Sequence, residues 1–170
     1  MKFIIYFFSI LFQMQLIYSR PELFIKNESD YEIQVKVYPV GIAQAALDAS
    51  VKYAKTRKQF GKSLAEFQGI QFKLADMATE IEAARLLTYK AAVMKDEGKD
   101  FSFAASLAKY YASEIATKAT NEAVQIHGGY GFIKEFPVER YYRDVKLCTI
   151  GEGTSEIQKK IMARQIVEQY

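Results

Sequence analysis

The fold class of this 170-residue chain is decided by residues 67–84, Phe67-Gln-Gly-Ile-Gln-Phe-Lys-Leu-Ala-Asp-Met-Ala-Thr-Glu-Ile-Glu-Ala-Ala84. Apolar side chains recur there every three or four residues, at Phe67, Ile70, Leu74, Met77, Ile81 and Ala84. This spacing predicts one face of a long amphipathic helix. Ser63 and Glu66 directly before it form a capping-box pattern, so we expect the helix to begin here and run to about Asp96.

Upstream of this segment, helical spacing begins near Gly41. One face of a first predicted helix consists of Ile42, Ala45, Ala46, Ala49 and Tyr53. The helix should end before the loop Arg57-Lys-Gln-Phe-Gly61, with Gly61 as its stop signal.

Downstream, the same spacing predicts a third helix that Gly128 and Gly129 end. Its inward positions are Phe103, Leu107, Tyr111, Ile115, Ala119 and Ile126. Pro137 suits the first turn of a short fourth helix. Thr154 or Ser155 can cap a last helix, whose apolar edge would be Ile157, Ile161 and Val167. We therefore expect an all-α, up-and-down four-helix bundle over residues 41–170.

The amino-terminal 40 residues have a different character. Residues 1–19 place Lys2 before a nearly continuous apolar run, which is typical of a secretory signal peptide. Residues 20–40 contain the alternating stretch Tyr31-Glu-Ile-Gln-Val-Lys-Val37, closed by Pro39. This alternation predicts either a short strand or an extended linker.

Composition argues against several classes of function. The formal net charge is +3, and Lys and Arg are interleaved with Asp and Glu, so nothing favours nucleic-acid binding. Cys148 is the single cysteine and His127 the single histidine, so we expect neither a disulfide framework nor a metal site. We expect His127 to serve packing or helix capping and Cys148 to be a small buried apolar residue.

One carboxylate occupies an unusual position. Glu152 lies between Gly151 and Gly153, directly ahead of the last predicted helix. Glycines on both sides let the backbone approach a ligand closely, and the free N–H groups that follow can receive an oxygen atom. A carboxylate placed there can act as a base. Spacing alone leaves a second interpretation open, in which Glu152 is an exposed loop acid.

Four motifs together resemble one known family. Ile150-Gly-Glu-Gly-Thr-Ser-Glu-Ile-Gln158, preceded by Tyr142-Arg-Asp-Val-Lys146, resembles the carboxy-terminal signature of acyl-CoA dehydrogenases. The segments 57–61, 67–77 and 125–131 resemble further family motifs, in the family's order and with similar spacing. The likeness is to short-chain and butyryl-CoA members. It implies the carboxy-terminal helical bundle of a protein that also has an amino-terminal helical domain and a middle strand domain, so we expect a truncated fragment.

The resemblance implies FAD-dependent α,β-desaturation of a short-chain acyl-CoA thioester. Glu152 matches the base that removes the α proton while FAD takes a hydride from the β carbon. Gly153 corresponds to a residue near the substrate, and Thr154, Ser155 and Glu156 correspond to the stretch that meets FAD. If Glu152 were not the base, Glu156 would be the next carboxylate to consider.

The resemblance also implies an oligomer. Arg57 and Gln68 fall where family members reach the FAD of a neighbouring subunit, and the turn from Gln125 to Gly129 is the other cofactor-facing segment. FAD then bridges protomers of a homotetramer, which passes electrons to an electron-transferring flavoprotein. Family members work in the mitochondrial matrix or the bacterial cytoplasm, whereas residues 1–19 resemble a secretory signal. The alternative is a non-catalytic helical bundle that mediates subunit association.

Overall fold

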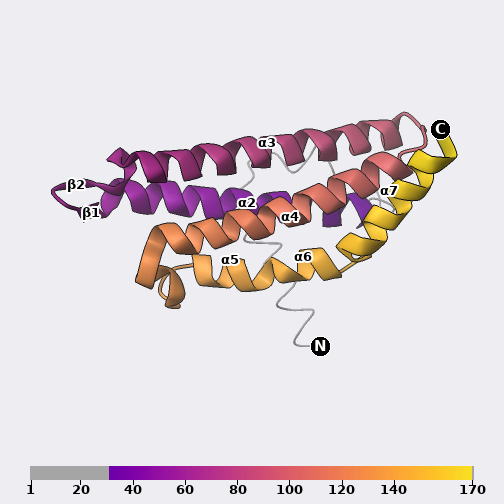
Figure 1. The fold of residues 1–170 in the computed structure, drawn as a ribbon. Helices are drawn as coiled ribbons and strands as arrows, with labels where there is room; N and C mark the ends of the chain where they lie inside the picture. Colours follow the sequence, from indigo (N-terminus) through magenta and orange to yellow (C-terminus); the bar gives the residue numbers. More distant parts are fainter. Residues whose placement is uncertain (1–30, 170) are drawn as a thin grey trace. The chain divides into compact units, whose positions relative to one another are not determined.

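The computed structural model describes residues 31–169. The chain divides into two units, Met1–Gln34 and Val35–Tyr170, and the packing described below lies within the second. The predicted signal-like segment, residues 1–19, and residues 20–30 of the predicted linker lie outside the described residues. Helices dominate the described part, so the predicted all-α fold is confirmed (Figure 1).

The first long helix, α2, spans Tyr31–Thr56 and begins earlier than predicted. The expected strand or linker before Pro39 was wrong, because this stretch is helical and Pro39 lies inside the helix. Alternation over seven residues is a weak signal, and packing routinely overrides local propensity. Here the helix continues directly into Val40 and Ile42, which are buried in the core.

A small hairpin follows α2 and was not predicted. Strands β1 (Lys58–Gln59) and β2 (Lys62–Ser63) pair in antiparallel register. Phe60 and Gly61 join them, with φ values of 52° and 80°. A two-residue hairpin turn needs positive φ at both central positions, which suits glycine. The prediction that the first helix ends before Arg57 is confirmed, since α2 ends at Thr56, but Gly61 forms the hairpin turn rather than the stop signal of the helix.

The two remaining long helices agree with the predicted periodicity. The short helix η3 (Leu64–Glu66) leads into α3 (Gln68–Asp96), and α4 spans Ser102–His127. The backbone N–H of Ser63 donates to Glu66 Oε1 at 2.7 Å, so the predicted capping box closes η3 rather than α3. Gly128, with φ of 59°, ends α4 as expected.

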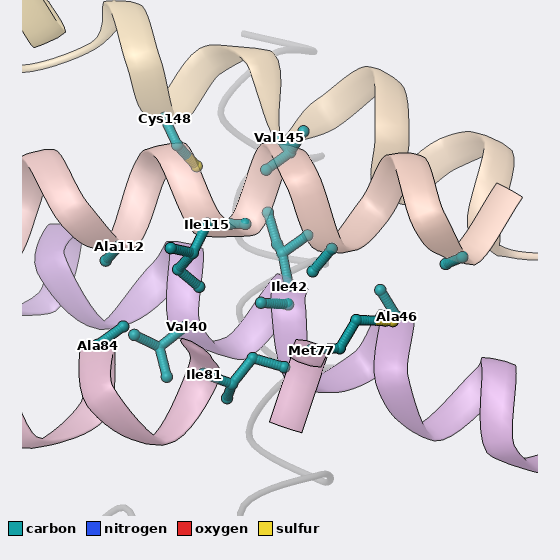
Figure 2. Packing of buried hydrophobic residues seen from close by; sticks show 14 of the residues in the cluster. Val40, Ile42, Ala46, Met77, Ile81, Ala84, Ala112, Ile115, Val145 and Cys148 are labelled. Carbon is teal, nitrogen blue, oxygen red and sulfur yellow. The ribbon is translucent and has the colours of Figure 1, made fainter. Parts of the chain in front are cut away.

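The core lies where α2, α3, α4 and the shorter segments α5 (Val138–Asp144) and α6 (Lys146–Ile150) meet (Figure 1). Figure 2 shows its side chains, among them Val40, Ile42, Ala46, Met77, Ile81, Ala84, Ala112, Ile115, Val145 and Cys148. Several are alanines, whose small side chains allow helix axes to approach closely while still excluding water. No helix within residues 31–169 is long and apolar enough to span a bilayer.

The last helix, α7 (Ser155–Gln169), packs against α4 through a face that was not predicted. Its buried residues are Ser155, Gln158 and Met162. On the expected apolar edge, Ile157 is 48% exposed and Val167 is 76% exposed. The predicted apolar edge therefore lies largely at the surface of this chain rather than against α4. Polar anchors described below hold α7 to α4, which leaves the apolar side chains at the surface.

Candidate active site

The loop before α7 has an unusual backbone. Gly151 is extended, whereas Glu152 and Gly153 have φ values of 54° and 90°. Besides Glu152, the only other non-glycine residue with positive φ in the described part is Phe60 of the hairpin turn. Holding an ordinary residue in this region costs about 1–3 kcal/mol, and such strain concentrates at functional sites. The predicted base is therefore held in a conformation that surrounding contacts must enforce.

Side chains from two helices hold this loop. Lys109 Nζ on α4 donates to the Gly153 carbonyl at 2.5 Å, and Gln158 Nε2 on α7 donates to the Glu152 carbonyl at 3.3 Å. A Cβ atom added to Gly153 would lie 2.7 Å from Gln158 Nε2. The positive φ favours glycine at position 153, and a side chain there would also displace the Gln158 amide from the Glu152 carbonyl.

Lys109 is a feature of the site that the motifs did not reveal. The residue is only 3% exposed, and burial lowers the pKa of its ammonium group. Cys148, Glu114, Glu152 and Glu156 oppose that shift. A signal existed in the sequence, because Lys109 falls on the same helical face as the buried residues Ala105, Ala112 and Ala116. A lone charge on an apolar face indicates a specific partner.

The predicted cofactor residues at the start of α7 take different roles. The Ser155 hydroxyl is buried and donates to Glu114 Oε1 on α4 at 2.6 Å. The Thr154 hydroxyl accepts the backbone N–H of Ile157 at 3.4 Å and so caps α7. Hydrogen bonds from its own backbone N–H and from Thr154 lower the pKa of Glu156, whose side chain is exposed. The side chains of Ser155 and Thr154 thus anchor α7, while Glu156 faces solvent.

A second group of predicted residues lines a pocket at the far end of α4. The pocket has a volume of about 480 Å³, and its walls include Arg57, Gly128 and Gly129. The Arg57 guanidinium lies 5.3 Å from the centre of the Tyr130 ring. A Cβ atom added to either glycine would meet nothing within 4 Å, so this backbone is open to a ligand.

Aromatic rings form the floor beside Arg57. The rings of Tyr53 and His127 stack with their centres 4.2 Å apart, and Phe136 packs edge-on against both. His127 Nδ1 donates to the Ala123 carbonyl at 2.7 Å. Burial lowers the pKa of His127, with the Ala123 hydrogen bond acting in the opposite direction. His127 is therefore fixed in the wall by packing.

The predicted residues do not converge on one point within the chain. Gln68 is the first residue of α3 and Gln125 lies in the last turn of α4; both are exposed, and neither lines the pocket. Lys109, which contacts the Glu152 loop, precedes Gln125 by about 24 Å of helix at 1.5 Å per residue. No group of three or more His, Cys, Asp or Glu side chains in the described residues could hold a metal ion.

A family model for the carboxy-terminal domain of acyl-CoA dehydrogenases matches residues 33–167. The chain belongs to the acyl-CoA dehydrogenase family. The match starts before the boundary expected at Gly41, as does α2.

Similar acyl-CoA dehydrogenase family members come from animals and bacteria. The mitochondrial short-chain specific acyl-CoA dehydrogenase of Bos taurus is 53% identical over 131 residues, which are 77% of this chain and 32% of that protein. A subunit of the caffeyl-CoA reductase–Etf complex of Acetobacterium woodii is 54% identical over 129 residues, 76% of this chain and 34% of that one. The solved butyryl-CoA dehydrogenase of Megasphaera elsdenii superposes with a TM-score of 0.80 and 51% identity, covering 81% of this chain and 36% of that one. This chain thus spans about a third of the length of its relatives.

Proposed function

We propose that this chain forms the carboxy-terminal domain of a flavin-dependent dehydrogenase that introduces an α,β double bond into a short-chain acyl-CoA thioester. Glu152 is the base that removes the α proton. The observation that supports this role is the strained backbone of Glu152, held between Gly151 and Gly153 by hydrogen bonds from Lys109 and Gln158. A loop acid without a function needs neither the strain nor two buried anchors.

The chemistry requires more than a carboxylate. A thioester α proton is too weakly acidic for an ordinary carboxylate in water, so the carbonyl must accept hydrogen bonds and water must be excluded. The exposed Glu152 carboxylate leaves room for a substrate against the loop. The backbone N–H groups around Gly153 can polarise the thioester carbonyl. We propose that the remaining walls come from the domains that relatives carry outside the matched region.

FAD is the proposed cofactor, and its binding would involve both ends of α4. When bound, FAD accepts the hydride from the β carbon. At the pocket, the Arg57 guanidinium can pair with phosphate oxygens, and the open backbone at Gly128 and Gly129 permits close approach to them. At the other end, Thr154 and Ser155 place the amino terminus of α7 beside Glu152. Gln68 and Gln125 are exposed and do not line the pocket, so their proposed contacts are with parts of the cofactor that extend beyond it.

Because the two ends of α4 are far apart, we propose that each FAD contacts two protomers of a homotetramer. Exposed apolar side chains support assembly, since Leu147, Ile150, Ile157 and Val167 are each about half exposed or more. An electron-transferring flavoprotein is the proposed electron acceptor, supported by the relative whose name includes an Etf complex. The proposed compartment is the mitochondrial matrix or the bacterial cytoplasm, supported by one relative that is named mitochondrial and others that come from bacteria.

The same exposed apolar residues support a second candidate function. In it, the bundle retains only the assembly surface and binds partner subunits without catalysis. The two candidates differ in what they require of Glu152, because an assembly surface does not need a carboxylate in a strained loop.

The test is Glu152→Gln in an enzyme completed with the upstream domains of a short-chain relative. Gln keeps the size and hydrogen bonding of Glu but cannot accept the α proton. We expect flavin content to stay unchanged and reduction of the flavin by butyryl-CoA to slow by about two to four orders of magnitude. Anaerobic stopped-flow absorbance measures the rate.

Glu168→Gln is the matched control and should keep the parental rate, because Glu168 is an exposed acid on α7 that pairs with Arg164 at 2.7 Å and lies outside every proposed site. A Glu152→Gln variant that bleaches its flavin at the parental rate would refute the proposed base. If butyryl-CoA reduces no flavin in the completed enzyme, with or without these substitutions, the result would favour the assembly function.

A further inference from the structure

Lys109 is a buried cation that no motif and no proposed catalytic step accounts for. It lies on α4, 3% exposed, with its ammonium 2.5 Å from the Gly153 carbonyl. Removing a charged amine from water is costly unless it gains strong partners, so an apolar residue would be the default at such a position. Its retention in the core points to a specific task at the loop.

The groups around Lys109 define that task. The charged or titratable groups that act on it are Glu114 on α4, Cys148 on α6, Glu152 in the loop and Glu156 on α7. Of these, Glu114 is engaged by the Ser155 hydroxyl. The ammonium therefore contacts the loop directly after Glu152, and acidic groups on α4, in the loop and on α7 act on its charge.

The hydrogen bonds fix two successive peptide planes. Gln158 holds the Glu152 carbonyl and Lys109 holds the next carbonyl, that of Gly153. Neither peptide bond is cis, and in a planar trans peptide the N–H points away from the C=O. The N–H groups of Gly153 and Thr154 are consequently directed away from the two anchoring side chains.

We propose that Lys109 is a positioning residue for Glu152: by binding the Gly153 carbonyl it holds the loop in its left-handed conformation and orients the neighbouring N–H groups outward. The consequence for catalysis rests on the proposed function, in which Glu152 is the base. The positioning itself is independent of catalysis and can be measured on the 170-residue chain.

Hydrogen–deuterium exchange with mass spectrometry compares Lys109→Met, which keeps the length of the side chain, with Lys118→Met. Lys118 is the matched control, an exposed lysine on the same helix paired with Glu80 at 2.6 Å. We expect amides of residues 150–158 to exchange about tenfold faster in Lys109→Met, as expected for loss of a charged hydrogen bond, with α3 unchanged. The control should leave the loop unchanged.

An unchanged loop in Lys109→Met would overturn the proposal. A uniform rise across α3, α4 and the loop would also overturn it, because Lys109 would then only stabilise the bundle. Lys109→Gln is a second variant, with a shorter polar side chain. We expect this variant to fold, and its loop amides to exchange more slowly than those of Lys109→Met. If neither variant folds by circular dichroism, Lys109 is a general stability residue and the proposal fails.

A charge-specific readout separates positioning from packing. In the chain labelled with ¹³C-lysine, the Lys109 ε-carbon should titrate below the ordinary lysine pKa, because the group is buried. Glu152→Gln removes a charge that raises the Lys109 pKa and should lower the midpoint further. Glu82→Gln on α3 is the control and should leave it unchanged.

If the Lys109 titration midpoint is the same in Glu152→Gln as in the parental chain, Lys109 does not face the loop acid and the proposal is overturned. This result is independent of flavin reduction. Failure of Lys109 as a positioning residue can therefore be told apart from failure of Glu152 as the base, which the stopped-flow experiment decides.

Discussion

The Glu152 loop and the Arg57 pocket are both predicted to serve one cofactor, yet they are built differently. The loop is strained and is held from within the chain by Lys109 and Gln158. The pocket is open, and Arg57 makes no ion pair among the described residues, stacking instead near Tyr130. The comparison indicates that contacts within one chain fix the conformation of the loop. The pocket, in contrast, leaves the Arg57 guanidinium available for the proposed cofactor.

The largest effect after loss of the base itself should come from Gly153→Ala. The new Cβ would lie 2.7 Å from Gln158 Nε2, at a backbone φ of 90° that alanine rarely adopts. The Gln158 amide must move away and release the Glu152 carbonyl, and a resulting displacement of the loop by about 1 Å can cost about 100-fold in rate. We expect flavin reduction by butyryl-CoA to fall by about that factor in the completed enzyme, with flavin content retained.

Gly98→Ala is the control for this substitution. Gly98 also has positive φ, 66°, but a Cβ there would meet nothing within 4 Å. This change should cost about 1 kcal/mol in the free energy of unfolding and leave the rate unchanged. If Gly153→Ala and Gly98→Ala reduce their flavin at equal rates, the proposal that catalysis depends on the exact position of the loop is wrong.

A smaller effect is expected at the pocket, and on cofactor retention rather than on chemistry. Arg57→Met removes a charged hydrogen-bond donor, and such bonds contribute about 1.5–3 kcal/mol, so FAD affinity should fall about 10- to 100-fold. Fluorescence titration of the completed apoenzyme measures it. Lys58→Met changes the neighbouring cation in β1, outside the pocket lining, and should bind FAD normally. If FAD affinity fell equally in Arg57→Met and Lys58→Met, Arg57 would contribute only as a general surface charge.

The smallest effect concerns stability at alkaline pH. Burial raises the pKa of Cys148 from 9.0 to about 12 and that of Tyr38 from 10.0 to about 12. Above pH 9 the unfolded chain releases protons that the folded chain keeps on these two groups, so their contribution to the free energy of unfolding falls as pH rises, while the lowered pKa of Lys109 acts in the opposite direction. The limiting slope for one group is about 1.4 kcal/mol per pH unit.

Urea unfolding at pH 7, 9 and 10 checks this dependence. Cys148→Ala should flatten the loss between pH 9 and 10, where Tyr38 contributes little. A parental slope in the variant would show that the buried thiol is not the group responsible.

Periodicity predicted the helices well because each long segment repeats its signal over many turns. The ends of α3 and α4, at Asp96 and Gly128, follow from the same pattern and its glycine stops. Short signals failed. Seven alternating residues after Tyr31 are helical, and Gly61 marks a hairpin turn whose two-residue strands are too short to show a pattern. Periodicity identified the apolar edge of α7 but cannot say whether the same chain covers it, and Ile157 and Val167 are exposed.

The site was predictable in part. Motifs predicted roles for Glu152 and Arg57, and these roles stay predictions, but only the fold shows that the two residues lie near different ends of α4. Lys109 was missed because it lies in no motif, and its partner is the backbone carbonyl of Gly153, 44 positions away. Every residue has a backbone carbonyl, so the sequence does not indicate which one a side chain binds. Contacts of this kind can be identified only in the folded structure.

The central claim is that the loop of one chain and the pocket of another make one site. Mixing Glu152→Gln chains with Arg57→Met chains in the completed enzyme tests it directly, at an FAD concentration where Arg57→Met alone stays largely unloaded. If sites form between chains, one Glu152 and one Arg57 come together in some mixed sites, and co-expression should restore about a quarter of parental activity from two inactive parents. If both residues serve a site within one chain, every mixed site carries a defect, and activity no higher than that of the two parents would contradict the account.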